Sequence, residues 1–399
     1  MKHRQSAWTR AEKRFGALTL LGVAALALWG WIDSLPTPPR LDLPEGAFIS
    51  NLLLSSDQRF LAVGGNIYNE DKLGNSIPTG MVALWDARTL EPQPIYRNSK
   101  HLRTFCLSTD SDEIGILNDA QKTFEWHDRA TQKLLWRFTA PKPCHAFRRV
   151  QFLERRSLVW LSANYDYGSR NFLLSARNGT LVHQWDDEGW SYLEAAVSPD
   201  ETIYARHEVK RELSGHLTSS LLILKNVDDG LISKRFKVPP PSSKPLFSPD
   251  GHSIFLLTFP DAEAPNIANN VVRRLDSRTG QQIWSFDALH VASDINAWRR
   301  YQISKQTGTS HNDPYDPVAF LAIAISPDSA TIAIIRAIDS TIYLLDARTG
   351  KQQRTLALPL GKAEMGSVTI STPLIFAPDG KHLFAHTNDS IFVWDLSVQ

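Results

Sequence analysis

The sequence predicts an all-β fold of seven similar units that follows one N-terminal transmembrane helix. Three observations predict it. The stretch Phe15–Ile32 contains no charged residue. Beyond residue 40, two turn patterns alternate along the chain with apolar strands between them. Successive copies of the first pattern lie 53, 45, 45, 50, 78 and 51 residues apart, and the long interval contains an insertion. A four-stranded propeller blade takes about 45 residues. We therefore expect a seven-bladed β-propeller over residues 41–399.

The N-terminal segment has the features of a membrane anchor. A helix over Phe15–Ile32 rises about 27 Å, close to the thickness of the hydrocarbon core. Residues 1–14 are rich in Lys and Arg, which predicts a cytoplasmic basic tail. Residues 33–40 form a Pro-rich linker. We expect a single-pass membrane protein whose propeller is extracytoplasmic, and periplasmic in a bacterium.

A cleaved signal peptide is the alternative interpretation. Ala25-Leu26-Ala27 has the small-residue spacing of a cleavage site. The apolar run continues for five residues beyond it, to Ile32, whereas a cleavage site normally follows such a run. The pattern therefore favours a signal-anchor that stays in place.

The first turn pattern resembles Ser-Pro-Asp-Gly and follows an apolar strand. Pro presets φ at the first turn position, and Asp and Gly suit the later ones. The clearest copies are Ser198–Asp200, Ser248–Gly251, Ser326–Asp328 and Ala377–Gly380. Degenerate copies are Ser55–Asp57, Ser108–Asp110 and Leu153–Arg155.

The second pattern is Asp-x-x-Thr-Gly, again after an apolar strand. Complete copies are Asp276–Gly280 and Asp346–Gly350. Variants are Asp86–Leu90, Asp128–Gln132, Ser175–Gly179 and Asn226–Gly230, and Asp395 begins a seventh. Two independent patterns with the same count indicate seven repeats, each of four strands.

These motifs carry a family resemblance. The Ser-Pro-Asp-Gly turns, with Trp85-Asp86 and Trp394-Asp395 at the ends of third strands, resemble degenerate bacterial-type WD40 repeats over roughly residues 41–399. Asp276–Trp284 and Asp128–Trp136 also resemble the tryptophan-docking repeats of quinoprotein-like propellers. The simpler interpretation of those two stretches, a turn followed by a Trp packed between blades, is favoured, and no cofactor is expected.

The last repeat ends before its fourth strand, and an open edge would expose unpaired backbone groups. Leu41–Pro44 ends like the fourth strands of other repeats, so we predict that it pairs with Ile391–Leu396 and closes the ring. The alternative is that this segment is linker.

In the closed ring, both turn patterns lie on one side of the disc, the tight-turn face. Loops between second and third strands and between repeats lie on the other, the loop face. The linker enters at the tight-turn face, which would look toward the membrane.

Four insertions are predicted on the loop face, where long loops often bind partners. They are Asn66–Thr79, Glu208–Ser219, Phe259–Asn270 and Asp287–Pro317. The acidic run Asp186–Trp190 is placed in a loop between the third and fourth repeats, as a contact site or a solvated segment. The candidate partner-binding residues are Trp190, Trp298, Arg299, Arg300, Tyr301, His311 and Asp313.

Composition excludes several functions. The net charge is +1, so no basic excess is available for nucleic acid. Cys106 and Cys144 are the two cysteines, too few for a disulfide scaffold, and two unpaired thiols are favoured over one bond. His290, His311, Asp313 and Asp316 match no known metal-site spacing, so no metal is expected. No catalytic motif is recognised, so no enzyme is predicted.

The favoured hypothesis is a membrane-anchored, non-enzymatic scaffold that binds a protein partner. One alternative is a binder of a small molecule or glycan in the central channel. The other is a quinoprotein- or lactonase-type enzyme, which would need convergent carboxylates or a cofactor platform in that channel.

Overall fold

The chain divides into two compact units, Met1–Pro39 and Arg40–Gln399. The computed structural model describes Pro38 and residues 40–55, 58–70, 76–98, 102, 104–108, 110, 112–118, 121–166, 168–188, 195–211, 217–239, 244–258, 271–287, 320–336, 341–357, 374–386 and 390–397. The predicted transmembrane helix Phe15–Ile32 lies outside this set. Within it, no helix is long and apolar enough to cross a membrane.

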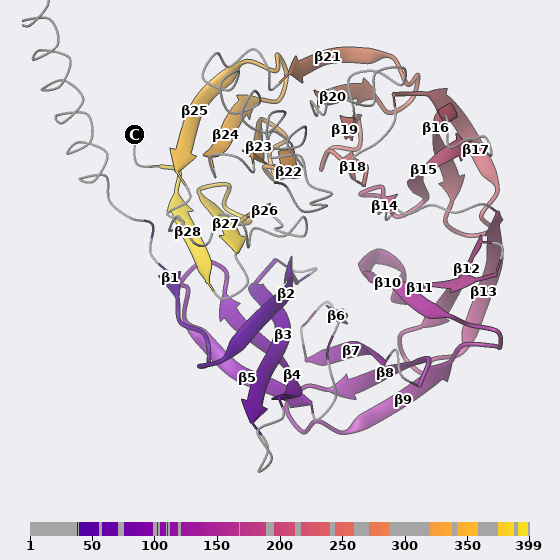
Figure 1. Cartoon of the computed structure of the whole chain (residues 1–399), viewed down its shortest axis with the longest axis vertical. Helices are drawn as coiled ribbons and strands as arrows, with labels where there is room; N and C mark the ends of the chain where they lie inside the picture. The colour runs from indigo at the N-terminus through magenta and orange to yellow at the C-terminus, as the bar shows by residue number, and fades with distance from the viewer. Residues whose placement is uncertain are drawn as a thin grey trace, which may run out of the picture. The chain divides into compact units, whose positions relative to one another are not determined.

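The second unit consists of seven four-stranded antiparallel sheets placed around a common centre (Figure 1). This confirms the predicted seven-bladed propeller. Blade 1 is β2 (Ala47–Leu54), β3 (Phe60–Glu70), β4 (Ser76–Asp86) and β5 (Pro92–Asn98). Blade 2 is β6 (Phe105–Leu107), β7 (Glu113–Asn118), β8 (Thr123–Asp128) and β9 (Leu134–Thr139). Blade 3 is β10 (Ala146–Leu153), β11 (Leu158–Tyr165), β12 (Gly168–Ser175) and β13 (Leu181–Glu188), with the 3-10 turn η1 (Glu154–Arg156) between its first two strands.

The remaining blades repeat this order from the inner to the outer strand. Blade 4 is β14 (Ala196–Val197), β15 (Ile203–Arg211), β16 (Leu217–Asn226) and β17 (Ile232–Lys237). Blade 5 is β18 (Leu246–Phe247), β19 (Ser253–Thr258), β20 (Val271–Asp276) and β21 (Gln282–Asp287). Blade 6 is β22 (Phe320–Ile325), β23 (Thr331–Arg336), β24 (Thr341–Asp346) and β25 (Gln352–Ala357). Blade 7 is β26 (Leu374–Phe376), β27 (His382–His386), β28 (Ile391–Asp395) and β1 (Arg40–Leu41).

The ring closes through β1, the outermost strand of blade 7. Arg40 pairs with Phe392 and Leu41 with Ile391, in antiparallel register. The Arg40 guanidinium also lies 4.9 Å from the centre of the Phe392 ring. The predicted pairing of the two chain ends is therefore confirmed, although the strand begins one residue earlier and is shorter than Leu41–Pro44.

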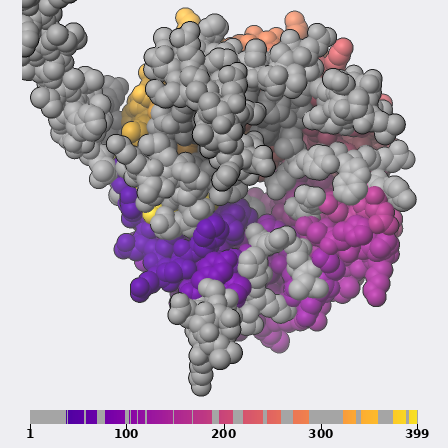
Figure 2. All heavy atoms as spheres, viewed as in Figure 1, coloured from indigo at the N-terminus to yellow at the C-terminus, as the bar shows by residue number. Residues whose placement is uncertain are grey.

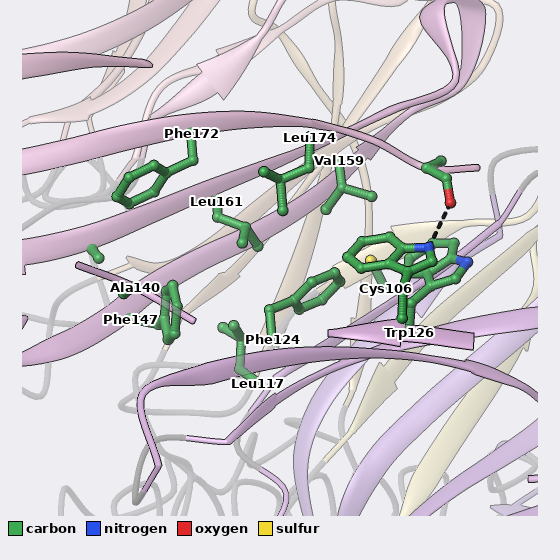
Figure 3. Packing of buried hydrophobic residues seen from close by; sticks show 13 residues of the cluster. Cys106, Leu117, Phe124, Trp126, Ala140, Phe147, Val159, Leu161, Phe172 and Leu174 are labelled. Atoms are coloured by element: carbon green, nitrogen blue, oxygen red, sulfur yellow. Dashed lines mark hydrogen bonds between the residues drawn. The ribbon is translucent and has the colours of Figure 1, made fainter. Parts of the chain in front are cut away.

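The core lies between blades rather than at the centre of the ring. Seven clusters of buried apolar side chains each join two neighbouring blades, and one of them joins blade 7 to blade 1. Figure 3 shows the cluster between blades 2 and 3, where Phe124 and Trp126 face Leu161 and Phe172. In the space-filling view, blade 1 in indigo and blades 2 and 3 in purple to magenta form neighbouring walls of the ring (Figure 2). Burial of these faces holds each blade to the next.

In blades 2 to 5, an aromatic residue of the outer strand packs against a glycine in a turn of the following blade. The Trp284 indole donates a hydrogen bond of 2.9 Å to the Ala347 carbonyl and packs against Gly350, whose φ is +71°. Trp136 makes the same contacts with Ala176, at 2.8 Å, and with Gly179. These contacts match the favoured interpretation of the two repeats as Trp residues packed between blades.

Candidate functional site

The inner strands of blades 1 to 5 surround a cavity at the centre of the ring. Its volume is about 460 Å³, within the range that suits a small molecule. It is lined from β2, β6, β10, β14, β18 and the residues beside them. Arg149 and Lys244 are its cationic lining residues, and the described lining contains no carboxylate. Asn51, Thr104 and Gln151 add neutral polar groups.

Arg149 is held in place within this cavity. A register shift in β10, between Phe147 and Arg149, changes the alternation of side chains at that point. The Arg149 guanidinium lies 4.6 Å from the centre of the Trp160 ring. It also donates hydrogen bonds to the Ala195 carbonyl and to the side-chain oxygen of Gln151. Stacking and hydrogen bonding together fix the plane of the guanidinium.

A buried polar cluster lies between blades 3 and 4. Asp187 on β13 accepts from Arg206 at 2.9 Å and from Lys225, which belong to β15 and β16. Tyr204 donates to the same carboxylate at 3.2 Å, and Asn171 donates at 3.0 Å. Asp187, Arg206 and Lys225 are 5%, 4% and 9% exposed. One carboxylate thus joins two cations and two neutral donors across the blade interface.

This cluster extends toward the cavity through aromatic side chains. Trp160 donates to the side-chain oxygen of Asn171 at 3.1 Å, and Trp185 donates to the Tyr204 hydroxyl at 2.8 Å. Burial, and then the Asp187 carboxylate, raise the pKa of the Tyr204 phenol, which keeps it protonated as a donor. Arg149, stacked on Trp160, and the Asp187 cluster therefore belong to one continuous layer.

The predicted placement of the acidic run is wrong for Asp186–Glu188, which form the end of β13 instead of a loop. Asp186 is exposed and forms a two-point ion pair with Arg170, at 2.6 and 3.0 Å. Asp187 points the other way and is buried. Alternation along a strand explains the difference, because successive side chains point to opposite faces.

A second buried carboxylate lies on the blade 2 side of the interface with blade 1. Glu125 is paired with Arg137 at 3.0 Å and with His127 at 3.3 Å. The His127 ring meets Tyr96 of blade 1 edge to face, with ring centres 6.2 Å apart. The Asp187 cluster differs from this one because two permanent cations, Arg206 and Lys225, contact its carboxylate.

His207 is the most isolated polar side chain in the described part of the chain. It is 1% exposed, and neither ring nitrogen has a hydrogen-bond partner among the described residues. Burial lowers its pKa to about 3. The imidazole is therefore neutral at physiological pH.

The described parts of the predicted insertions Asn66–Thr79 and Glu208–Ser219, residues 66–70, 76–79, 208–211 and 217–219, belong to strands rather than to loops. β3 and β4 stay paired out to Glu70 and Ser76, and β15 and β16 out to Arg211 and Leu217. β-Branched and aromatic residues such as Ile67, Tyr68 and Ile77 favour continuation of the ladder. Two β-hairpins thus project on the loop face. The described residues do not include 259–270 or 288–319, where the other two insertions lie.

An exposed aromatic pair lies at the base of the blade 1 hairpin. Phe48 and Tyr68 are 41% and 42% exposed, and their rings meet edge to face with centres 6.4 Å apart. The Tyr68 amide donates to the Gly46 carbonyl at 3.3 Å, which joins the hairpin to the start of β2. Rigid exposed aromatic side chains are typical of binding hot spots.

The tight-turn face uses its polar groups internally. Asp346 accepts from the Thr349 hydroxyl and amide, both at 2.7 Å, and these bonds lower its pKa. Asp328 accepts from the Ser326 hydroxyl at 2.5 Å, the first cause of its lowered pKa. The recurring Asp residues therefore stabilise turns.

The predicted partner-binding residues Trp190, Trp298, Arg299, Arg300, Tyr301, His311 and Asp313 all lie outside the described residues. Cys106 is buried in β6, Cys144 is partly buried before β10, and both are free cysteines. Burial raises the pKa of the Cys106 thiol.

Among the residues that the structure describes, no group of three or more His, Cys, Asp or Glu side chains could hold a metal ion.

The sequence contained one signal for the buried cluster that the sequence analysis missed. Arg206 directly follows the apolar run Ile203–Ala205 of β15, and Lys225 directly follows the apolar run Leu221–Leu224 of β16. A cation at a core-facing position needs a buried partner, which pointed to an acidic residue on an adjacent blade.

Comparison with known proteins shows the fold alone. No protein-family profile matches the sequence, and no curated protein sequence matches it. The β-propeller domain of Cps50 (Swd1) from Myceliophteria thermophila is 11% identical and covers 90% of this chain and 99% of its own, with a TM-score of 0.56. A chain of a mitotic checkpoint complex is 11% identical and covers 90% of this chain and 91% of its own, with a TM-score of 0.59.

Proposed function

We propose that this chain is a membrane-anchored, non-enzymatic propeller of the WD40-like type that binds a protein partner through its loop face. The observation that carries this proposal is the Phe48–Tyr68 pair at the base of the β3–β4 hairpin. It combines exposed aromatic area with a rigid backbone, which lowers the entropic cost of association. The two similar solved structures support the architecture, and one of them is a chain of a multi-protein assembly, the mitotic checkpoint complex.

The charge pattern before Phe15 supports an extracytoplasmic propeller, and β1 supports its orientation. Because β1 runs antiparallel to β28, the chain enters blade 7 from the end where Asp395 lies, at the tight-turn face. A Pro-rich linker over residues 33–40 would keep that face near the bilayer. The loop face with its hairpins would then point away from the membrane, toward a partner.

A photo-crosslinking residue placed at Tyr68 in the full chain, in its native membrane, tests the partner surface. The matched control is the same residue at Leu231, which is 64% exposed at a turn on the opposite face. We expect one recurrent protein from position 68 and none from position 231. In a second experiment, F48A/Y68A should lower recovery of that protein at least tenfold by affinity capture, whereas L231A should not.

Equal capture from both positions would contradict the orientation, and no capture from either would contradict the scaffold function. Deletion of residues 1–32 tests the anchor separately. The propeller should then leave the membrane fraction on alkaline extraction, whereas the full chain should remain in it.

The central cavity favours a second function, the binding of a small molecule. A lactonase-type site would need several carboxylates converging on the channel, and the described lining contains none. Its charged groups are cationic instead. The cavity therefore supports ligand binding better than hydrolysis.

A further inference from the structure

The tight-turn face carries exposed apolar side chains along its outer edge. Of the nine large apolar side chains exposed in the described part of the chain, seven lie at the start of a fourth strand or in the turn before it. They are Leu134 and Leu135 of blade 2, Leu181 and Val182 of blade 3, Leu231 and Ile232 of blade 4, and Ile283 of blade 5. We call these seven residues, which are 39–64% exposed, the apolar rim. A concentration of exposed apolar side chains marks a surface that contacts another molecule or a membrane.

A bulge in the fourth strands turns rim residues toward solvent. Leu135, Val182 and Ile283 are each the one residue that the neighbouring strand does not pair, because the register shifts there. Blade 6 has the same shift and places Gln353 at this position. The backbone therefore does not require an apolar side chain at the bulge, and the rim needs another explanation than folding.

The rim is continuous from blade 2 to blade 5. The Trp136 ring packs against Gly179, in the turn that precedes Leu181. The Trp185 ring packs in the same way against Gly230, in the turn before β17. Blades 4 and 5 are joined by an equivalent contact. The seven side chains thus follow one arc, because each turn lies against the outer strand of the blade before it.

Exposed basic side chains accompany the rim. Lys133 directly precedes β9, and Arg177 and Arg278 lie in the turns of blades 3 and 5. The carboxylates of these turns already accept hydrogen bonds or an ion pair from the protein itself, namely those of Asp128, Asp228, Asp229 and Asp276. Apolar side chains next to Lys and Arg match the boundary between acyl chains and anionic headgroups of a bilayer.

The course of the chain before β1 indicates the same partner. The chain enters blade 7 at the tight-turn face, the face that carries the rim. The uncharged run Phe15–Ile32 ends eight residues before Arg40, so an anchor there brings a bilayer within about 25 Å of β1. Blade 7 lies across the ring from blades 3 and 4, the middle of the rim (Figure 1). Anchor and rim would therefore hold opposite sides of the disc.

We propose that the apolar rim of blades 2 to 5 rests on the surface of a lipid bilayer that contains anionic lipids. Its apolar side chains reach the acyl chains, and Lys133, Arg177 and Arg278 lie among the headgroups. This inference rests on the proposed membrane anchor, and it adds a second membrane contact. With both contacts in place, the loop face stays turned away from the bilayer and open to a protein partner.

The test uses the full chain with p-benzoylphenylalanine at a single position, reconstituted in vesicles of phosphatidylcholine and phosphatidylglycerol. Irradiation should give lipid adducts at position 182 and none at position 68, since Tyr68 is exposed on the loop face. With the probe at position 283, L181D/V182D should lower the yield of lipid adducts about fivefold. Q352D/Q353D makes the same change in charge at the corresponding exposed positions of blade 6 and should leave the yield unchanged. The thermal midpoint of each variant shows whether the fold is retained.

Retention of the full chain in the vesicles after an alkaline wash tests the anchor separately. Retention without adducts at positions 182 and 283 overturns the rim contact and leaves the anchor standing. Adducts at neutral pH without retention would contradict the anchor and support the rim contact. An equal loss of adducts in L181D/V182D and Q352D/Q353D overturns the proposal, because charge alone would then explain the effect. Crosslinks from position 182 to a second copy of the chain, in place of lipid, also overturn it, because the rim would then be an interface between copies.

Discussion

Replacing Asp187 by asparagine would leave Arg206 and Lys225 facing a neutral amide inside the protein. The side chains have nearly the same shape, so no cavity forms. Tyr204 and Asn171 can still donate to the remaining amide oxygen. The substitution therefore isolates the electrostatic role of one carboxylate at the interface of blades 3 and 4.

The magnitude follows from burial and from the contacts of the carboxylate. Removal of one partner from a buried ion pair costs about 3–5 kcal/mol, because the remaining charge is left uncompensated. D187N should lower the free energy of unfolding by an amount within that range, since both cations are nearly inaccessible to solvent. K225M should cost about 1 kcal/mol or less, because Asp187 keeps Arg206 and its neutral donors, and methionine replaces the apolar stem of lysine.

Urea denaturation followed by tryptophan fluorescence measures both variants, with the transition slope as a check that the unfolding reaction is unchanged. D187N should lower the midpoint far more than K225M does. D187N/K225M should recover part of the loss, since only one of the two cations remains. If K225M is as destabilising as D187N, the carboxylate does not act by compensating both cations, and the reasoning fails.

Two further predictions concern the turns and the buried imidazole. G350A adds a Cβ 2.8 Å from Trp284 at a φ of +71°, so it should lower the thermal midpoint more than G251A, which has a similar φ but 3.9 Å to its nearest atom. Because the pKa of His207 is about 3 in the folded chain and about 6.5 unfolded, the unfolded state binds more protons between these values. Stability should therefore fall by about 2 kcal/mol from pH 7 to pH 5. H207L should remove that part of the loss in urea titrations at the two pH values, and an unchanged loss would refute the assignment.

The architecture followed from the sequence because local chemistry specifies it. Turns such as Ser326–Asp328 and Asp346–Gly350 need particular residues at particular positions, so they mark strand ends without knowledge of the rest of the fold. Even the degenerate copy Leu153–Arg155 coincides with a turn, because Glu154–Arg156 form η1, which ends at Ser157 in the left-handed conformation. Closure of the ring by the segment that begins at Arg40 was predictable for a different reason. The seventh repeat lacked its fourth strand, and Leu41–Pro44 ends like the fourth strands of other repeats.

The candidate site could be predicted only in part, because it depends on contacts between blades. Nothing in the local sequence of Asp187 distinguishes it from Asp186, yet one is buried by blade 4 and the other is solvated. Likewise, the turn patterns do not show which inner-strand residues line the channel, since bulges such as that before Arg149 change the alternation. These features depend on register and on the neighbouring blade.

The distribution of polar groups gives the two faces of the disc different roles. On the tight-turn face, carboxylates such as Asp346 and Asp328 accept from their own turns, so these acceptors stabilise the fold and are less available to a ligand. On the loop face, the hairpin ladders satisfy their own backbone groups, which leaves Phe48 and Tyr68 free to contact another molecule. Lys244 lies at the same mouth of the channel. A protein partner bound on this face would therefore also cover this mouth of the channel.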